Sequence, residues 1–224
     1  MGAVALFLLT FFLAVCVNPA RTASPDDLRE QTVHVLSFRG ESADGSGSGV
    51  VFKGSDGSNY VFTAAHCVPD TCDQRMVVEV HPLDSGVLIQ LDTEIVMVDR
   101  ARDLALLRVT SPHTFRIYAR ASTQRPRTGQ WVQHIGFWGG HTMAHGYSMG
   151  QVAANDVPAC PWVKVKCDGA NLSAAPGCSG GPVFDDKGQF IGIMLGVSPG
   201  GMSYYVPLHE VHASLFAARF PVTF

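Results

Sequence analysis

Short runs of strand-forming residues recur along this chain about every 8–12 residues, and turn residues separate them. Regular spacing of many short strands is typical of β-sandwiches and β-barrels. The chain also holds 23 glycines and 13 prolines, which fit a protein with many turns. We therefore expect an all-β fold.

The expected strands form two groups of roughly six, and a Pro- and Arg-containing connector near residues 111–130 separates them. Only residues 208–220 have apolar side chains at helical spacing, which predicts a C-terminal helix. Residues 44–49 are rich in Gly and Ser and are expected to form a flexible turn. The expected strands cover residues 32–38, 50–52, 59–63, 76–81, 87–91, 95–98 and 104–109, then 132–137, 150–154, 162–167, 189–195 and 202–206.

The N-terminal segment is strongly apolar. Residues 3–17 form an almost unbroken apolar run of 15 residues, whereas a membrane-spanning helix needs about 20. The run suits the apolar region of a secretory signal peptide covering residues 1–23, with cleavage near Ala20 or Ala23. An uncleaved anchor or a lipoprotein signal at Cys16 are the alternatives. Apart from such an anchor we expect no membrane contact, and we place the protein outside the cytosol, either secreted or periplasmic.

The charge balance is slightly acidic, with 16 Lys and Arg against 19 Asp and Glu and a net charge of −3. This balance gives no support to nucleic-acid binding. Apolar residues make up 46% of the chain, which is enough for a substantial core and argues against disorder.

The cysteines suit an oxidising compartment. Beyond Cys16, two close pairs, Cys67 with Cys72 and Cys160 with Cys167, could each close a short loop, and Cys178 is left over. A zinc site is the rival interpretation of these pairs. Their spacings differ from the usual C-x2-C pattern, so we expect no metal there, and no cofactor. His134, His141 and His145 are assigned to a solvent-facing loop. Metal binding needs a fixed geometry, which a Gly-rich loop does not supply.

Three motifs carry chemistry, in the order His, Asp, Ser. His66 lies in the run T-A-A-H-C, Asp103 directly precedes the apolar run L-A-L-L, and Ser179 lies in G-C-S-G-G-P. A serine hydroxyl is a weak nucleophile at neutral pH, so it needs a general base, and the base needs an orienting partner. The glycines around Ser179 allow a turn that directs backbone N–H groups at one point. Each motif alone is commonplace, but the set indicates a catalytic site.

These motifs resemble the His, Asp and Ser motifs of the chymotrypsin-like (trypsin-fold) serine proteases. Residues 47–51, 129–136, 167–182 and 184–192 further resemble the HtrA/Deg-type branch, so the likeness covers about residues 30–210. It implies two six-stranded antiparallel β-barrels at about 30–110 and 131–206, a linker at 111–130 and a helix at 207–220, within a protease domain spanning 24–224. The PDZ module that usually follows in that branch is not in this sequence, which implies a stand-alone protease or a truncated chain.

The resemblance implies a serine endopeptidase that hydrolyses protein or peptide substrates through an acyl-enzyme. Ser179 would be the nucleophile, His66 the general base and then acid, and Asp103 the orienting carboxylate. The backbone N–H groups of Gly177 and Ser179 would form the oxyanion hole. A catalytically silent trypsin-fold binding module is the alternative, and the oligomeric state is left open.

The chain departs from the family at Cys178, where many secreted relatives carry an Asp that receives the freed N-terminus, so we expect no such activation switch. Cys178 as nucleophile is an alternative that its neighbours Pro176 and Ser179 disfavour, because the viral cysteine relatives have glycines there. An uncharged substrate pocket for small or medium apolar side chains is expected, although a basic preference through Asp168 stays open. The pocket residues implied by position are Ser173, Ser198, Gly200 and Ser203.

Overall fold

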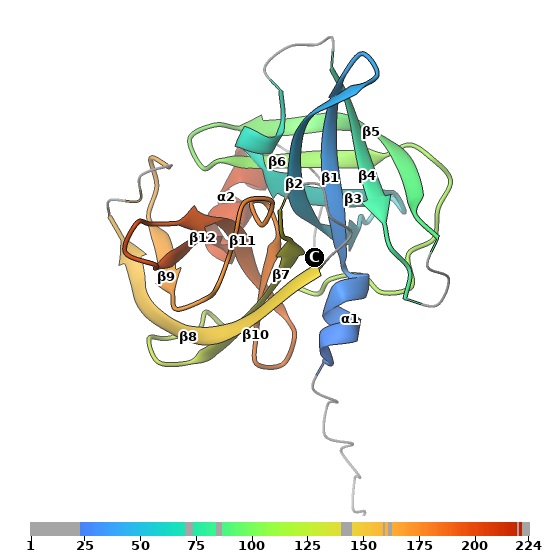
Figure 1. Cartoon of the computed structure of the whole chain (residues 1–224). Coiled ribbons are helices and arrows are strands. Elements are labelled where there is room, and N and C mark those ends of the chain that lie inside the picture. The colour runs from blue at the N-terminus through green and yellow to red at the C-terminus, as the bar shows by residue number, and fades with distance from the viewer. Residues whose placement is uncertain are drawn as a thin grey trace, which may run out of the picture.

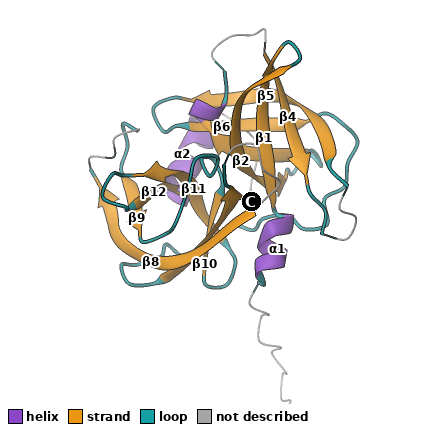
Figure 2. Cartoon of the chain, viewed as in Figure 1, coloured by secondary structure: helices purple, strands orange, loops and turns teal. Residues whose placement is uncertain are grey.

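The computed structural model describes residues 23–69, 74–83, 87–139, 145–158, 160, 163–218 and 220. Strands dominate these residues, and the two α-helices lie near the two ends of the described chain (Figures 1 and 2). Cys72, which was predicted to pair with Cys67, lies outside the described residues. The same holds for His141 and for most of the predicted signal peptide. The elements are α1 (Pro25–Glu30), β1 (Thr32–Arg39), β2 (Ser42–Lys53), β3 (Asn59–Ala64), the short 3-10 helix η1 (Ala65–Cys67), β4 (Gln74–Val80), β5 (Ile89–Asp99), β6 (Leu104–Val109), β7 (Trp131–Phe137), β8 (His145–Val157), β9 (Cys167–Ala170), β10 (Pro182–Asp185), β11 (Phe190–Val197), β12 (Ser203–Pro207) and α2 (Leu208–Ala217).

The strands close into two antiparallel six-stranded barrels, as the sequence predicted. The first has the order β1-β2-β3-β6-β5-β4, and the second has the order β10-β11-β12-β9-β8-β7 (Figure 1). Closure pairs each of these twelve strands on both sides, so the described strands present no open sheet edge. The connector between Val109 and Trp131 joins the two barrels.

Each barrel has its own apolar interior, and a third cluster joins them. Val35 and Val61 belong to the cluster inside the first barrel, and Val183 belongs to the one inside the second. The joining cluster contains residues from both barrels and both helices, and Phe52 packs edge-on against Phe190 with ring centroids 5.0 Å apart. The barrels are therefore docked through a continuous apolar seam.

The expected flexible turn at residues 44–49 is wrong, because this segment is part of the long strand β2. Its glycines are needed for close contacts rather than for bending. A Cβ on Gly47 would lie 2.5 Å from Cys67 Sγ and 3.0 Å from the Ser179 carbonyl oxygen, and one on Gly49 would lie 2.5 Å from Val61. Tertiary contacts thus override the turn-like composition.

Several other boundaries differ from the predictions. The strands expected at 87–91 and 95–98 are replaced by one strand, β5, which starts at Ile89 and has a bulge between Ile95 and Met97. The strand expected at 162–167 begins only at Cys167. The short strand β10 was not predicted as a separate strand, because Pro182 at its start reads as a turn residue.

Both helices have identifiable local causes. Helix α1 was not predicted, although Ser24 and Asp27 form a capping box at its start and Pro25 occupies its first turn. Helix α2 matches the predicted C-terminal helix but ends at Ala217, and it buries Val211 and Leu215 against the seam. Among the described residues, no helix is long and apolar enough to cross a membrane.

Candidate active site

His66 lies in η1, the short turn that directly follows β3. Hydrogen bonds hold this turn in place from the loop between β5 and β6. The Ala65 N–H donates to the Asp103 carbonyl oxygen at 3.0 Å, and Arg100 donates to the carbonyl oxygens of Ala65 and Val68. The His66 backbone is therefore fixed independently of its side chain.

Asp103 is buried, and its carboxylate binds His66 twice. Oδ1 accepts the His66 backbone N–H at 2.7 Å, and Oδ2 lies 2.6 Å from His66 Nδ1. Asp103 also has a φ of +54°, a left-handed conformation that few residues other than glycine adopt. The surrounding hydrogen bonds hold this strained residue in place, and strain of this kind gathers at functional sites.

The hydrogen bond to Asp103 is the main reason that the pKa of His66 is raised from 6.5 to about 10, and a second hydrogen bond to Cys67 adds to the rise. The His66 side chain is half-exposed. Because Nδ1 is occupied by the carboxylate, Nε2 is the nitrogen left for proton exchange with a substrate or a nucleophile.

Ser179 lines the same cavity as His66 but is hydrogen-bonded elsewhere. Its Oγ donates to the Leu195 carbonyl oxygen at 3.0 Å, and among the described residues it makes no hydrogen bond to His66. Its own carbonyl oxygen accepts the Ser48 N–H at 2.7 Å. The cavity has a volume of about 570 Å³. It is lined by His66, Arg100, Asp103, Ala174, Ala175, Pro176, Cys178, Ser179, Leu195, Gly196 and Val197.

The loop before Ser179 forms a tight turn with glycine at its third position. Cys178 N–H donates to the Ala175 carbonyl oxygen at 3.0 Å, and Gly177 has a φ of +96°, which explains why glycine stands there. The Pro176 carbonyl oxygen accepts from Gly139 N–H at 2.7 Å. In a trans peptide, C=O and N–H point in opposite directions, so the Gly177 N–H is directed away from Gly139.

Ser48 supports this loop from the first barrel, a role that the sequence analysis missed. Its Oγ donates to the Gly177 carbonyl oxygen at 2.7 Å and accepts the Phe137 N–H at 2.8 Å. Ser48 itself is fully buried. The sequence signals for it were a serine flanked by glycines, in a segment that we assigned to a turn, and the likeness of residues 47–51 to the HtrA/Deg-type branch.

The four residues predicted for the substrate pocket do not line this cavity. Ser203 is buried and its Oγ donates to the Leu172 carbonyl oxygen at 2.6 Å. Ser198 and Gly200 lie in the turn between β11 and β12, and Ser173 is exposed in the loop after β9. The cavity walls are instead formed by two other segments, residues 174–176 and 195–197.

Asp168 is the residue through which a preference for basic substrate side chains was left open. It is fully buried and does not line the cavity. Arg125 Nη2 donates to its Oδ1 at 2.5 Å, and the Asp156 N–H donates to the same oxygen at 3.0 Å. Asn155 Nδ2 donates to its Oδ2 at 3.1 Å. The carboxylate is therefore already paired inside the second barrel.

The cysteines do not form disulfides among the described residues. Cys160 and Cys167 are both thiols, and their mutual hydrogen bond is the main cause of a raised pKa at Cys167. The pairing of Cys67 with Cys72 stays a prediction, because Cys72 lies outside the described residues. Cys178 is buried, and burial raises the pKa of its thiol to about 11, which makes it a poor nucleophile.

The histidines assigned to a loop are partly misassigned. His134 is fully buried in β7, where its Nδ1 lies 2.9 Å from the Pro182 carbonyl oxygen, and burial lowers its pKa to about 4. His145 begins β8 and packs against Phe137 with ring centroids 4.2 Å apart.

Comparisons with known proteins agree with this architecture. A family described as "Trypsin-like peptidase domain" matches residues 47–193, more than half of the chain. A "Probable periplasmic serine endoprotease DegP-like" of Brucella suis is 36% identical over 163 residues, covering 70% of this chain and 29% of that protein. "Serine protease Do-like HtrA" of Bacillus subtilis is 27% identical over 154 residues, covering 66% of this chain and 33% of that protein.

The chain thus spans about a third or less of the length of these two relatives. Among solved structures, the inactive form of the Mycobacterium tuberculosis protein Rv3671c superposes with a TM-score of 0.68 at 20% identity, covering 90% of this chain and 94% of that one. That likeness shows the fold. The family match over residues 47–193, on two closed six-stranded barrels, shows that this chain belongs to the trypsin-like peptidase family.

Proposed function

We propose that this chain is a serine endopeptidase of the HtrA/Deg type, with Ser179 as nucleophile, His66 as general base and acid, and Asp103 as the carboxylate that orients His66. The observation that carries the proposal is the 2.6 Å contact between His66 Nδ1 and Asp103 Oδ2, in a cavity that Ser179 also lines. The names of the relatives, serine endoproteases of the DegP and HtrA type, support the same activity.

In the proposed reaction, Ser179 Oγ attacks the carbonyl carbon of the scissile peptide while His66 Nε2 accepts the Oγ proton. The C–N bond then breaks, the leaving amine takes that proton from His66, and an acyl-enzyme remains. Water, deprotonated by His66, attacks the acyl carbon and releases Ser179. Asp103 holds the imidazole in one orientation and stabilises its charged form throughout.

The oxyanion would be bound by the N–H groups of Gly177 and Ser179. The Gly177 N–H is directed away from Gly139 because the Pro176 carbonyl oxygen is hydrogen-bonded there. Ser48 anchors the other side of Gly177 through its carbonyl oxygen. Donors fixed in advance stabilise charge that develops only in the transition state, so they accelerate the reaction rather than only tightening binding.

The described geometry corresponds to a resting state. Ser179 Oγ is hydrogen-bonded to the Leu195 carbonyl oxygen, and a pKa of about 10 keeps His66 protonated at neutral pH. For catalysis, Ser179 Oγ must turn towards Nε2 and His66 must lose its proton. We propose that substrate binding along residues 195–197 competes for the Leu195 carbonyl and releases the serine.

The substrate side chain next to the cleaved bond is proposed to be small or medium-sized and apolar. Ala174, Leu195 and Val197 supply apolar walls to the cavity. The only carboxylate among its described lining residues belongs to Asp103, which is engaged by His66. A peptide library should therefore show cleavage after Ala or Val, and preferred cleavage after Lys or Arg would contradict this assignment.

The location is proposed to be extracytoplasmic. Residues 3–17 have the length and apolar character of a signal peptide core, and the Brucella relative is named periplasmic. N-terminal sequencing of the protein recovered from cell fractions tests this. A mature start near residue 21 or 24 outside the cytosol is expected, and an intact cytosolic precursor would contradict it.

The experiment that tests the activity is labelling of the full chain with a fluorophosphonate, followed by peptide mapping. We expect one adduct, on Ser179, which His66→Ala abolishes. Ser173→Ala is the matched control, because Ser173 is exposed and does not line the cavity, and it should label normally. Absence of an adduct and of casein cleavage in a chain shown folded by circular dichroism would favour a silent binding module.

A further inference from the structure

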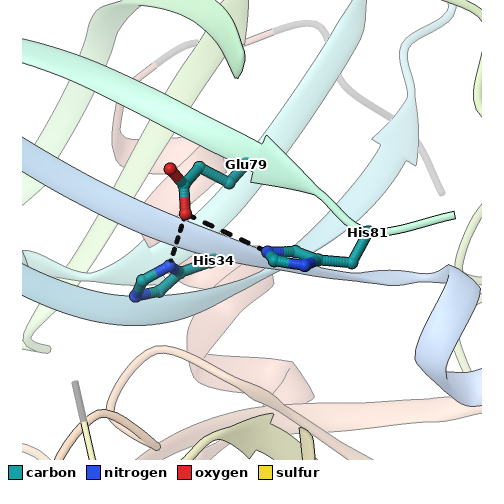
Figure 3. A group of neighbouring side chains, drawn as sticks. All are labelled: His34, Glu79 and His81. Atoms are coloured by element: carbon teal, nitrogen blue, oxygen red, sulfur yellow. Dashed lines mark hydrogen bonds and ion pairs between the residues drawn. The ribbon is translucent and has the colours of Figure 1, made fainter. Parts of the chain in front are cut away.

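A second group of titratable side chains lies in the first barrel, away from the catalytic cavity. His34, Glu79 and His81 face one another, and their nitrogen and carboxylate ligand atoms all lie within 4.8 Å (Figure 3). His34 and Glu79 are buried, and the His81 side chain is 8% exposed. The proposed reaction uses none of these groups.

Strand pairing explains why the three side chains meet. His34 on β1 and Glu79 on β4 are directly opposite each other in the antiparallel register. His81 follows Glu79 by two residues, which brings its side chain to the same face as that of Glu79. The barrel therefore places three potential metal ligands at one point, although His34 is 45 residues from Glu79 in sequence.

The spacing of the ligand atoms suits a single metal ion. His34 Nδ1 lies 2.9 Å and His81 Nε2 lies 3.9 Å from the same oxygen, Glu79 Oε2. Ligands bound to tetrahedral zinc at about 2.0–2.1 Å are roughly 3.4 Å apart. The two observed separations lie on either side of that value, so small side-chain movements would accommodate the ion.

On His34 and Glu79, the side-chain atoms that would not bind the metal already have hydrogen-bond partners. His34 Nε2 lies 2.7 Å from Ser46 Oγ, and Gln90 Nε2 donates to Glu79 Oε1 at 2.8 Å. Partners of this kind orient metal-binding imidazoles and carboxylates in zinc sites. Metal binding at His34 Nδ1 would place the ring proton on Nε2, from which it can be donated to Ser46.

His81 supplies an independent indication of a ligand site. Its Nε2 is buried and has no hydrogen-bond partner among the described residues, although it is directed at Glu79 (Figure 3). A buried polar atom without a protein partner is costly, so this nitrogen is available to bind a ligand.

Two further groups border the cluster. The His145 ring packs edge-on against His81 with centroids 5.8 Å apart, and its buried Nδ1 also has no partner among the described residues. Arg29 is near enough to His81 for its positive charge to act on that ring. A bound cation would therefore coexist with one guanidinium, and the Glu79 carboxylate supplies the compensating negative charge.

We propose that His34 Nδ1, His81 Nε2 and the Glu79 carboxylate bind one Zn²⁺ ion, with His145 or water as the fourth ligand. Two imidazoles and one carboxylate form a ligand set that zinc accepts. The His34 ring stacks on the ring of Phe137, and the Phe137 N–H donates to Ser48 Oγ. Because Ser48 supports the oxyanion loop, the ion would stabilise the side of the first barrel that holds this loop.

The test is zinc titration of the metal-stripped full chain against a chromophoric chelator, which requires no enzymatic activity. We expect one Zn²⁺ per chain, and a loss of affinity of at least tenfold in His81→Ala and Glu79→Gln. Gln90→Leu should weaken binding by about 10–100-fold, because it removes only the outer partner of Glu79. His209→Ala, on an exposed histidine of α2, is the matched control and should bind as the parent does.

Cobalt(II) provides the second measurement. Its visible spectrum reports the coordination geometry, and a thiolate ligand adds a charge-transfer band in the near ultraviolet. A tetrahedral spectrum without that band, lost in His81→Ala, is expected. No bound metal, unchanged affinity in a folded His81→Ala, or a thiolate band that survives this substitution would overturn the proposal. If Glu79→Gln does not fold, His81→Ala and Gln90→Leu still decide the matter.

Discussion

Substitution of Ser48 by alanine should reduce turnover by loosening the loop that carries the proposed oxyanion hole. The substitution removes the hydroxyl that joins the Gly177 carbonyl oxygen to the Phe137 N–H. The backbone bond from Ser48 N–H to the Ser179 carbonyl oxygen does not involve the hydroxyl and should persist. The variant therefore perturbs the position of Gly177 while Ser179 stays anchored.

The contacts set the size of the expected losses in stability and in turnover. A buried group left without a hydrogen-bond partner costs about 1–3 kcal/mol. Phe137 N–H is fully buried but Gly177 is only half-buried, so the free energy of unfolding should fall by about 2–3 kcal/mol in total. Removing an oxyanion donor lowers kcat by about 10²–10³. Because the Gly177 N–H is displaced rather than deleted, we expect a fall of about 10–100-fold.

The assay measures kcat and KM on a peptide substrate together with unfolding by urea. Thr32→Val is the matched control, because its buried hydroxyl donates to the Leu28 carbonyl oxygen at 2.9 Å, far from the Gly177 loop in sequence and on another element. It should destabilise the fold without lowering kcat. Two results would refute this role of the Ser48 hydroxyl. One is a Ser48→Ala variant that is destabilised as expected but keeps the parent kcat, and the other is an equal loss of turnover in both variants.

Four further predictions concern the same site. Asp103→Asn should fold but lose about 10⁴ in kcat, because the imidazole loses its orienting carboxylate, and near-normal kinetics would exclude Asp103 from the mechanism. Because the pKa of His66 is raised and only neutral imidazole accepts a proton, kcat/KM should increase as the pH rises from 6.5 towards 10, and a plateau reached below pH 7 would contradict this. The same pair stabilises the fold fully below about pH 6.5, and that contribution should be lost as the pH rises through about 10. Iodoacetamide should leave Cys178 unmodified in the folded chain at pH 8, since the pKa of its buried thiol is about 11, and rapid alkylation mapped to Cys178 would show an exposed or activated thiol.

The parts of the fold that the sequence predicted well are those in which local pattern and tertiary environment agree. Strand β6 matched its predicted range, because the apolar run at residues 104–107 begins directly after Asp103 and is followed by only Arg108 and Val109 before the strand ends. Residues in such a run are buried on both faces, so no alternative structure competes. The two-barrel architecture followed from the resemblance carried by the His, Asp and Ser motifs, which periodicity alone does not provide.

Contacts between distant strands were beyond prediction. His34 and Glu79 lie in ordinary strand sequences, and only the register of β1 against β4 brings them together. Histidine and glutamate at this separation form no recognisable motif, so the only metal ligands considered from the sequence were the cysteines and the later histidines. The pocket residues were inferred by counting positions from Ser179, and that procedure depends on loop lengths that vary between relatives.

The segment that misled the secondary-structure prediction is also the one that completes the site. Gly47 admits the Cys67 side chain and the Ser179 carbonyl, and a Cβ on Gly180 would lie 2.3 Å from the Ser48 carbonyl oxygen. Small residues therefore occur on both sides of the contact between β2 and the Ser179 loop, because the two backbones touch there. Ser48 belongs to the first barrel and Gly177 to the second. The proposed oxyanion hole therefore depends on the docking of the two barrels, and neither barrel can form it alone.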